Sequence, residues 1–180
     1  MNTEDISPNA VDTDTEAGRK RKGDSVSRQI TKLRLKTDFD IRNMSIEYLT
    51  AGFKEGDFYL NEEYRHNFDW NRSKKSRYIE SIFIGYPVPP LFLADNDDGR
   101  CDIVDGVQRI SAVAGFVLGD LAVSDLTKLT ELNGLKFTDL SARLQENFKK
   151  TMLRVIVFER KTSLQARKDF FEIMNTHWVQ

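Results

Sequence analysis

The chain has 180 residues, a formal net charge of −1, and 39% hydrophobic and 11% aromatic residues. This length supports one domain with its own core, and the near-zero charge excludes a protein that binds nucleic acid through bulk positive charge. The single cysteine, Cys101, excludes an internal disulfide and favours a reducing compartment. No apolar run is long enough to span a membrane, so we expect a cytoplasmic protein. With two histidines and no Cys/His cluster, a zinc site is not expected.

The first segment, residues 1–30, is rich in Asp, Thr, Ser and Asn and contains the basic block "RKRK" at 19–22. This composition predicts a disordered polar arm. The basic block is typical of a solvated tail, and the alternative is a patch that binds phosphate or serves in targeting. We expect the ordered domain to cover residues 31–180, with a C-terminus that is truncated relative to a longer protein.

The next elements follow from apolar spacing and from turn residues. The pattern predicts a helix after the N-cap Ser45, a short strand in "GDFYLN", and a helix in "NRSKKSRYIESIFIG" that stops at Gly85. Two strands, "LFLA" and "CDIV", flank the hairpin signal Asp98-Gly99. A helix is then expected from 106 to about 118.

The last third of the chain adds a helix in "DLSARLQENFKK", a strand at 152–159 and a final helix. Thr162 and Gln165 have the spacing of a capping box for that final helix. Interleaved strands and helices indicate an α/β or α+β fold with a small mixed sheet and surrounding helices.

The junction "DIVDGVQRIS" at 102–111 is the most informative stretch, and two interpretations stay open. In one, Asp105 and Gln108 form a capping box and Gly106 eases the turn from strand to helix. That reading leaves Arg109 unexplained, because a cation near a helix N-terminus opposes the macrodipole unless an anion is bound. In the other, backbone N–H groups, Gly106 and the Arg109 guanidinium form a phosphate site, and replacing Arg109 leaves the stability of the unliganded protein unchanged. No Walker sequence is present.

Other candidate residues have both a structural and a functional interpretation. The basic start of the helix near residue 72 either contacts phosphate or forms a solvated face, with Arg77 and Glu80 placed to pair. Glu80 is also a candidate catalytic acid. Asp102 is expected on the solvent or edge face of its strand, with a magnesium role as the alternative, and Cys101 either packs as a small apolar residue or acts as a thiol nucleophile. Four residues form the basic start: Arg72, Lys74, Lys75 and Arg77.

Four motifs fall in order along the chain: "GYPVPPLFL", "DIVDGVQRISAVAGF", "LNGLKFTDL" and "DFFEIMNT". Together they resemble the Asp-Gly-Gln-Gln-Arg domain at the N-terminus of GmrSD-type modification-dependent restriction proteins, a ParB/sulfiredoxin-like family. The resemblance covers about residues 45–177. It implies a ParB-like fold in which the signature loop binds nucleoside triphosphate, with hydrolysis in some phage-defence members, and recognition of modified DNA coupled to a C-terminal nuclease in others.

Carried onto this chain, the signature assigns nucleotide binding to the loop at 105–109 and catalysis to three of its side chains. Val107 replaces the first Gln of the signature, Arg65-His66 replaces an upstream Gln-Arg pair, and His177-Trp178 replaces two glycines after Asn175-Thr176. The implied binding residues are Asp105, Gly106, Val107, Gln108 and Arg109, and the implied catalytic residues are Asp105, Gln108 and Arg109.

The resemblance therefore implies a nucleoside-triphosphate-binding domain of a DNA-defence or modification-dependent restriction protein. Its partners would be the nucleotide, with or without Mg²⁺, DNA, and a nuclease domain or subunit. Weak NTPase activity is compatible with Val107, and nuclease activity is not expected from this chain alone. Two alternatives stay open: a non-catalytic DNA-recognition module of ParB-like type, whose loop holds backbone phosphate, and an inactive truncated fragment.

Overall fold

The structure of the protein, a computed structural model, describes residues 15–34, 37–61 and 69–177. The chain divides into two compact units, Met1–Lys36 and Thr37–Gln180, which are described separately. The first unit contains a single described helix, α1 (Glu16–Arg34), and the second contains the sheet and all the other helices in the described residues.

Helix α1 corrects the expectation of a disordered arm for residues 16–30; residues 1–14 lie outside the described residues. Lys, Arg, Glu and Gln are good helix formers, and the Thr15 hydroxyl accepts a hydrogen bond from the N–H of Gly18 in the first turn. Its 19 residues are polar on average. Within the described residues, no helix combines the length and the apolar character that crossing a membrane requires.

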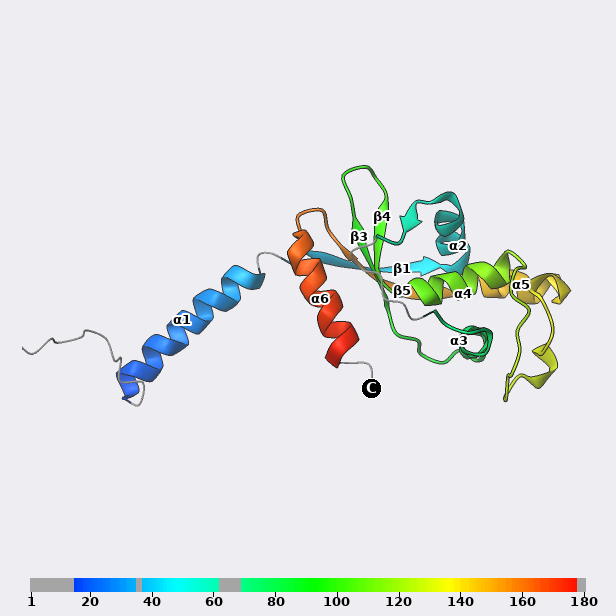
Figure 1. The fold of residues 1–180 in the computed structure, drawn as a ribbon, viewed down its shortest axis with the longest axis horizontal. Helices are drawn as coiled ribbons and strands as arrows, with labels where there is room; N and C mark the ends of the chain where they lie inside the picture. Colours follow the sequence, from blue (N-terminus) through cyan, green and yellow to red (C-terminus); the bar gives the residue numbers. More distant parts are fainter. Residues whose placement is uncertain (1–14, 35–36, 62–68, 178–180) are drawn as a thin grey trace, which may run out of the picture. The chain divides into compact units, whose positions relative to one another are not determined.

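The second unit is an α+β fold built on one open five-stranded mixed sheet with the strand order β1-β5-β3-β4-β2 (Figure 1). The β1–β5 and β3–β4 pairs are antiparallel, whereas β5–β3 and β4–β2 are parallel. The strands are β1 (Phe39–Ser45), β2 (Phe58–Tyr59), β3 (Leu91–Asp95), β4 (Cys101–Asp105) and β5 (Met152–Phe158). The helices are α2 (Ile46–Glu55), α3 (Arg72–Ile84), α4 (Val107–Val117), α5 (Ala142–Lys150) and α6 (Leu164–His177), with short 3-10 turns η2 (Thr130–Leu132) and η3 (Phe137–Asp139).

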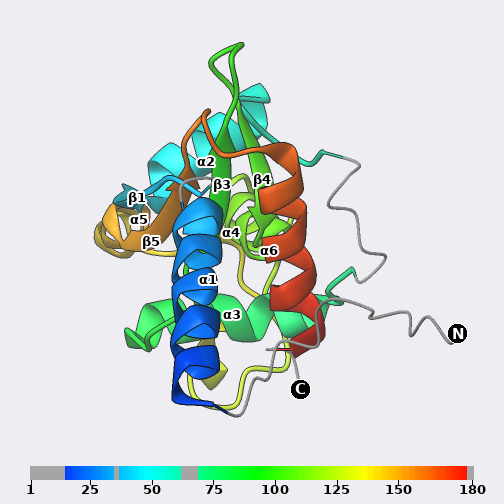
Figure 2. The same ribbon diagram turned by 90° about the vertical axis from the view of Figure 1, so that its left-hand side faces the viewer.

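Helices cover both faces of the sheet, and the alternation of side chains along the strands divides the core accordingly. In β3, Leu91 and Leu93 pack into the larger core with α2, α3, α4 and α5, whereas Phe92 and Ala94 face a smaller core with α6. Figures 1 and 2 show α6 on one side of the sheet and α2, α4 and α5 on the other. The junction between β4 and α4 lies where the sheet meets the larger helical layer.

Most element boundaries agree with the pattern of the sequence. The Ser45 side chain caps α2 by accepting from the N–H of Tyr48, and Gly85 ends α3 in the left-handed conformation. The cap predicted for the final helix is wrong. The Ser163 hydroxyl accepts from the N–H of Ala166, and Thr162 instead exchanges two hydrogen bonds with the backbone of Asp38 at 2.7 and 2.9 Å.

Candidate functional site

The β4–α4 junction turns at Gly106, which is the N-cap of α4 and has left-handed backbone angles, φ 104° and ψ 13°. A Cβ atom at this position would lie 2.5 Å from Cδ2 of Leu91 and 3.2 Å from Nη2 of Arg109. Glycine is therefore required here for two separate reasons, the positive φ and the lack of space. The tight turn brings the backbone of α4 directly to the end of the strand.

Replacing Gly106 by alanine is expected to lower the free energy of unfolding by about 1–3 kcal/mol, because backbone strain and crowding act together. Gly119 is a matched control, since its φ is 87° and nothing lies within 4 Å of its Cβ position. Urea denaturation should therefore show a smaller loss for Gly119→Ala. Equal losses at the two positions would mean that crowding by Leu91 contributes nothing.

The predicted capping box at Asp105 and Gln108 is wrong. Gly106 is the N-cap, and the Asp105 carboxylate accepts a hydrogen bond from Nη2 of Arg109 instead of the helix N–H groups. Asp105 still belongs to β4, where it is paired with Phe92, so its side chain leaves the strand before the helix begins. Within the described part of the chain, no side chain caps the N–H groups of the first turn of α4.

Arg109 is buried, with 8% of its surface exposed, and its guanidinium has three partners inside the domain. Nη1 donates to the carbonyl oxygens of Pro89 and Pro90 at 2.6 and 2.8 Å, and Nη2 donates to Asp105. These bonds tie the proline segment before β3 to the loop at the start of α4. These bonds give Arg109 internal partners that the sequence did not indicate, so we expect its loss to destabilise the unliganded protein, contrary to the expectation from the sequence.

Gln108 connects the same loop to the segment that enters α3. Its side-chain oxygen accepts from the N–H of Trp70 at 3.1 Å, and its amide nitrogen donates to Oδ1 of Asp69 at 3.0 Å. Val107 is half-buried and packs against the larger core. The five predicted site residues thus form one braced turn, in which Gln108 and Arg109 hold neighbouring segments through their side chains.

Residues 46–180 match the family model described as the GmrSD restriction endonuclease, N-terminal domain. The chain belongs to this family. No curated protein and no solved structure matches the chain. The match spans the sheet-and-helix unit from α2 onward and includes the β4–α4 junction of this GmrSD N-terminal domain.

Tyr78, on α3, lies near Arg109 of the GmrSD domain, a neighbour that the sequence did not indicate. Its ring meets Trp70 edge-on with centroids 5.6 Å apart, and its hydroxyl is buried without a hydrogen-bond partner among the described residues. Burial raises the pKa of Tyr78 to about 12, and the nearby positive charge of Arg109 opposes that rise. The hydroxyl is therefore protonated at neutral pH and is available to donate.

Glu80 has a structural role instead of the ion pair with Arg77 or the catalytic role considered from the sequence. It is buried, and Oε1 accepts from the N–H groups of Lys128 and Leu129 at 2.9 and 2.8 Å. The carboxylate therefore fixes the loop that follows α4 against α3. Two hydrogen bonds from backbone N–H groups are a common way to satisfy a buried carboxylate.

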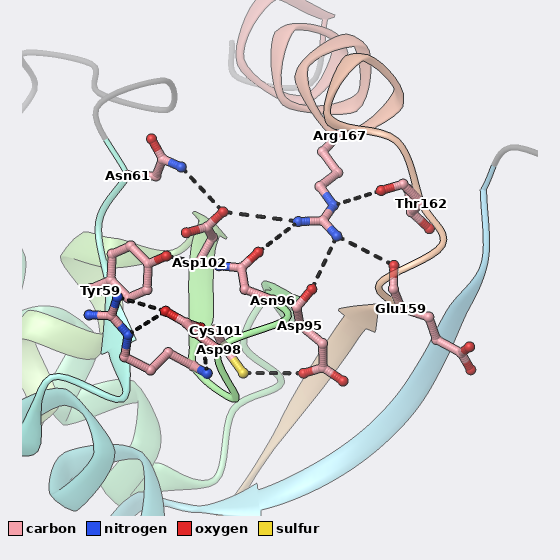
Figure 3. Close-up of polar contacts among 11 residues, drawn as sticks. Tyr59, Asn61, Asp95, Asn96, Asp98, Cys101, Asp102, Glu159, Thr162 and Arg167 are labelled. Atoms are coloured by element: carbon pink, nitrogen blue, oxygen red, sulfur yellow. Dashed lines mark hydrogen bonds and ion pairs between the residues drawn. The ribbon is translucent and has the colours of Figure 1, made fainter.

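Asp102 is buried on the face of β4 that α6 covers, with 3% exposure, which corrects its expected position on the solvent or edge face. Oδ2 lies 4.0 Å from Nη1 of Arg167 and accepts from Asn61, whereas Oδ1 has no hydrogen-bond partner among the described residues (Figure 3). Arg167 joins α6 to four further acceptors: the carbonyl oxygens of Asp95, Glu159 and Thr162, and Oδ1 of Asn96.

Cys101 lies at the start of the same strand, and its thiol donates to Oδ1 of Asp95 at 3.2 Å. Burial and, next, this hydrogen bond raise the pKa of Cys101 to about 12. The thiol is therefore protonated at neutral pH, whereas nucleophilic chemistry requires the thiolate. This geometry supports the interpretation of Cys101 as a packed residue.

Three of the positions at which the resemblance implies a departure from the family pattern, Arg65, His66 and Trp178, lie outside the described residues. The side chains of Asn175, Thr176 and His177 lie outside them as well, although the backbone of all three belongs to α6.

Proposed function

We propose that this chain is the nucleoside-triphosphate-binding domain of a DNA-defence restriction protein, with the phosphates held at the start of α4. The observation that supports this most directly is the uncapped first turn of α4 behind Gly106. Free N–H groups and the positive end of the helix dipole favour an anion at such a turn. The membership of the GmrSD family supports the role in restriction.

In this proposal the side chains of the signature have supporting roles, and the backbone holds the phosphate. Arg109 donates two hydrogen bonds to proline carbonyl oxygens and one to the Asp105 carboxylate, so it fixes the loop. Its guanidinium also adds positive charge next to the loop. Gln108 fixes the adjoining segment at Trp70. Because the turn is braced on both sides, its N–H groups are held in position before a phosphate arrives, which reduces the cost of binding.

Hydrolysis is expected to be slow, because Val107 offers no hydrogen bond to a phosphate or to an attacking water. Positioned donors that act in the transition state are what accelerate phosphoryl transfer. A bound Mg²⁺ would neutralise phosphate charge, and Asp69 and Asp105 are the carboxylates beside the loop that could hold it together with the nucleotide. A nuclease domain or subunit is the proposed partner, since the matched family is the N-terminal part of an endonuclease.

Val107→Glu and Val107→Gln form a matched pair that tests the phosphate site. Both replace a half-buried valine by a longer polar side chain, and only glutamate places a negative charge at the first helical residue. We expect Val107→Glu to weaken nucleotide binding about tenfold or more relative to Val107→Gln, through repulsion of the phosphates. A negative charge there favours the helix itself, so the melting temperature of the unliganded glutamate variant should not be lower.

The measurement is isothermal titration of ATP, GTP and CTP, each with and without magnesium, into the wild-type chain and both variants. Binding of at least one nucleotide to the wild type, lost selectively in Val107→Glu, supports the proposal. Equal affinities in the two variants would place the phosphates elsewhere. If none of the three nucleotides binds the wild type, the proposed function is wrong.

A further inference from the structure

A basic pocket lies on the surface beside the first turn of α3 and has a volume of about 330 Å³. We call it the Trp70 pocket and define it by Trp70, Arg72, Lys75, Asp120 and Lys136. Three cations and one carboxylate face one small volume, although the whole chain has a net charge of −1. The pocket therefore has a local excess of positive charge, which is the electrostatic pattern of an anion-binding surface.

Among the described residues, the three cations of the Trp70 pocket have no ion-pair partner. Neither Lys75 nor Lys136 forms an ion pair with any residue in the described ranges. Arg72 is fixed through Nε, which donates to the carbonyl oxygen of Ala122 at 2.7 Å, and this bond orients its guanidinium at the pocket wall. Two ammonium groups and one fixed guanidinium thus come from two segments of the chain, α3 and the start of η3.

Trp70 provides an aromatic surface in the same pocket as these cations. Its ring is partly exposed, and the edge-on contact with Tyr78 and the ammonium of Lys74, 5.1 Å from the ring centroid, hold it in place. Lysine and arginine beside a fixed aromatic ring are what proteins use to bind single-stranded nucleic acid, because the cations meet the backbone and the ring stacks on an unpaired base.

We infer that the Trp70 pocket binds single-stranded DNA, with a base on Trp70 and the flanking phosphates on Arg72, Lys75 and Lys136. The cations come from two segments, α3 and the start of η3, so they can meet successive phosphates of an extended phosphodiester backbone, and the domain belongs to a family of endonuclease domains. This site is separate from the proposed phosphate site at α4 and does not depend on nucleotide binding there. The two are linked physically, since Gln108 holds the backbone of Trp70.

The lysines are tested by fluorescence anisotropy with a short labelled single-stranded oligonucleotide over a series of salt concentrations. We expect the double variant Lys75→Gln/Lys136→Gln to bind more weakly, with a salt-dependence slope smaller by about 1.4, about 0.7 for each lost contact to a single-strand phosphate. The matched control is Lys54→Gln/Lys128→Gln, which removes two exposed lysines outside the pocket. The control should bind with the wild-type affinity and slope.

The aromatic surface is tested by Trp70→Leu and Trp70→Phe in the same assay. Leucine keeps an apolar side chain but cannot stack, so its affinity should fall on the order of tenfold, whereas phenylalanine should retain most of the binding. The inference is overturned if the double lysine variant binds like its control. It is also overturned if polyglutamate or free ATP competes as effectively as unlabelled oligonucleotide, because the pocket would then serve an acidic protein or a free nucleotide.

Discussion

Substituting Arg109 by methionine is expected to lower the free energy of unfolding by about 3–5 kcal/mol. The guanidinium is buried and satisfies the carbonyl oxygens of Pro89 and Pro90 together with the carboxylate of Asp105. Methionine fills a similar volume but leaves those three acceptors without their donor, and a buried acceptor that loses its partner is costly. Since small domains are stable by only about 5–15 kcal/mol, a loss of this size is a large fraction of the total.

Urea denaturation followed by circular dichroism measures this effect. The matched control is Arg143→Met on α5, where the arginine is exposed and a change within about 0.5 kcal/mol is expected. Arg109→Lys should fall between the two, because one ammonium cannot reach both proline carbonyls and the carboxylate with the geometry of a guanidinium. A loss below about 1 kcal/mol for Arg109→Met would contradict the bracing role.

The second large effect is expected at Arg167, which is 6% exposed and joins α6 to the β3–β4 turn and to the end of β5. Arg167→Met removes four hydrogen bonds and leaves Asp102 as a buried carboxylate without its cation. We expect a loss of about 3–5 kcal/mol in the free energy of unfolding. The loss should be concentrated in α6, because Arg167 is its polar attachment to the sheet.

Hydrogen exchange distinguishes a loss of stability confined to α6 from a loss that extends over the whole domain. In Arg167→Met the backbone amides of α6 should exchange faster, while those of β5 in the larger core keep most of their protection. Arg160→Met replaces a nearby exposed arginine and should leave both regions unchanged. Uniform loss of protection across the sheet would show that Arg167 supports the whole core instead of one helix.

The elements that the sequence predicted well are those whose signals are local. The strand at 152–159 follows from its alternating apolar residues, and the end of α3 follows from Gly85, which has the left-handed conformation that glycine favours. The hairpin at Asp98-Gly99 is likewise confirmed between β3 and β4. In each case neighbours along the chain determine the conformation, so no knowledge of distant contacts is needed.

The candidate site was less predictable because its partners are distant in sequence. The spacing of Asp105 and Gln108 is that of a capping box, but it carries no sign that Arg109 folds back onto Asp105 and the proline carbonyls. The same limit applies to Asp102, whose burial results from Arg167 on α6. The polar composition of residues 16–30 indicates that this segment does not form a packed core. It does not exclude a solvated helix, and α1 is such a helix.

The position of β5 in the sheet has a consequence for the order in which the protein can be assembled. β5 lies between β1 and β3, although it leaves the ribosome after every other described strand of this sheet. Until it arrives, β1 lacks its partner in the sheet and β3 has one open edge, so the larger core cannot close during synthesis of the first 150 residues. Such unpaired edges attract other chains, and nascent copies of this domain therefore depend on the late strand to avoid associating with each other.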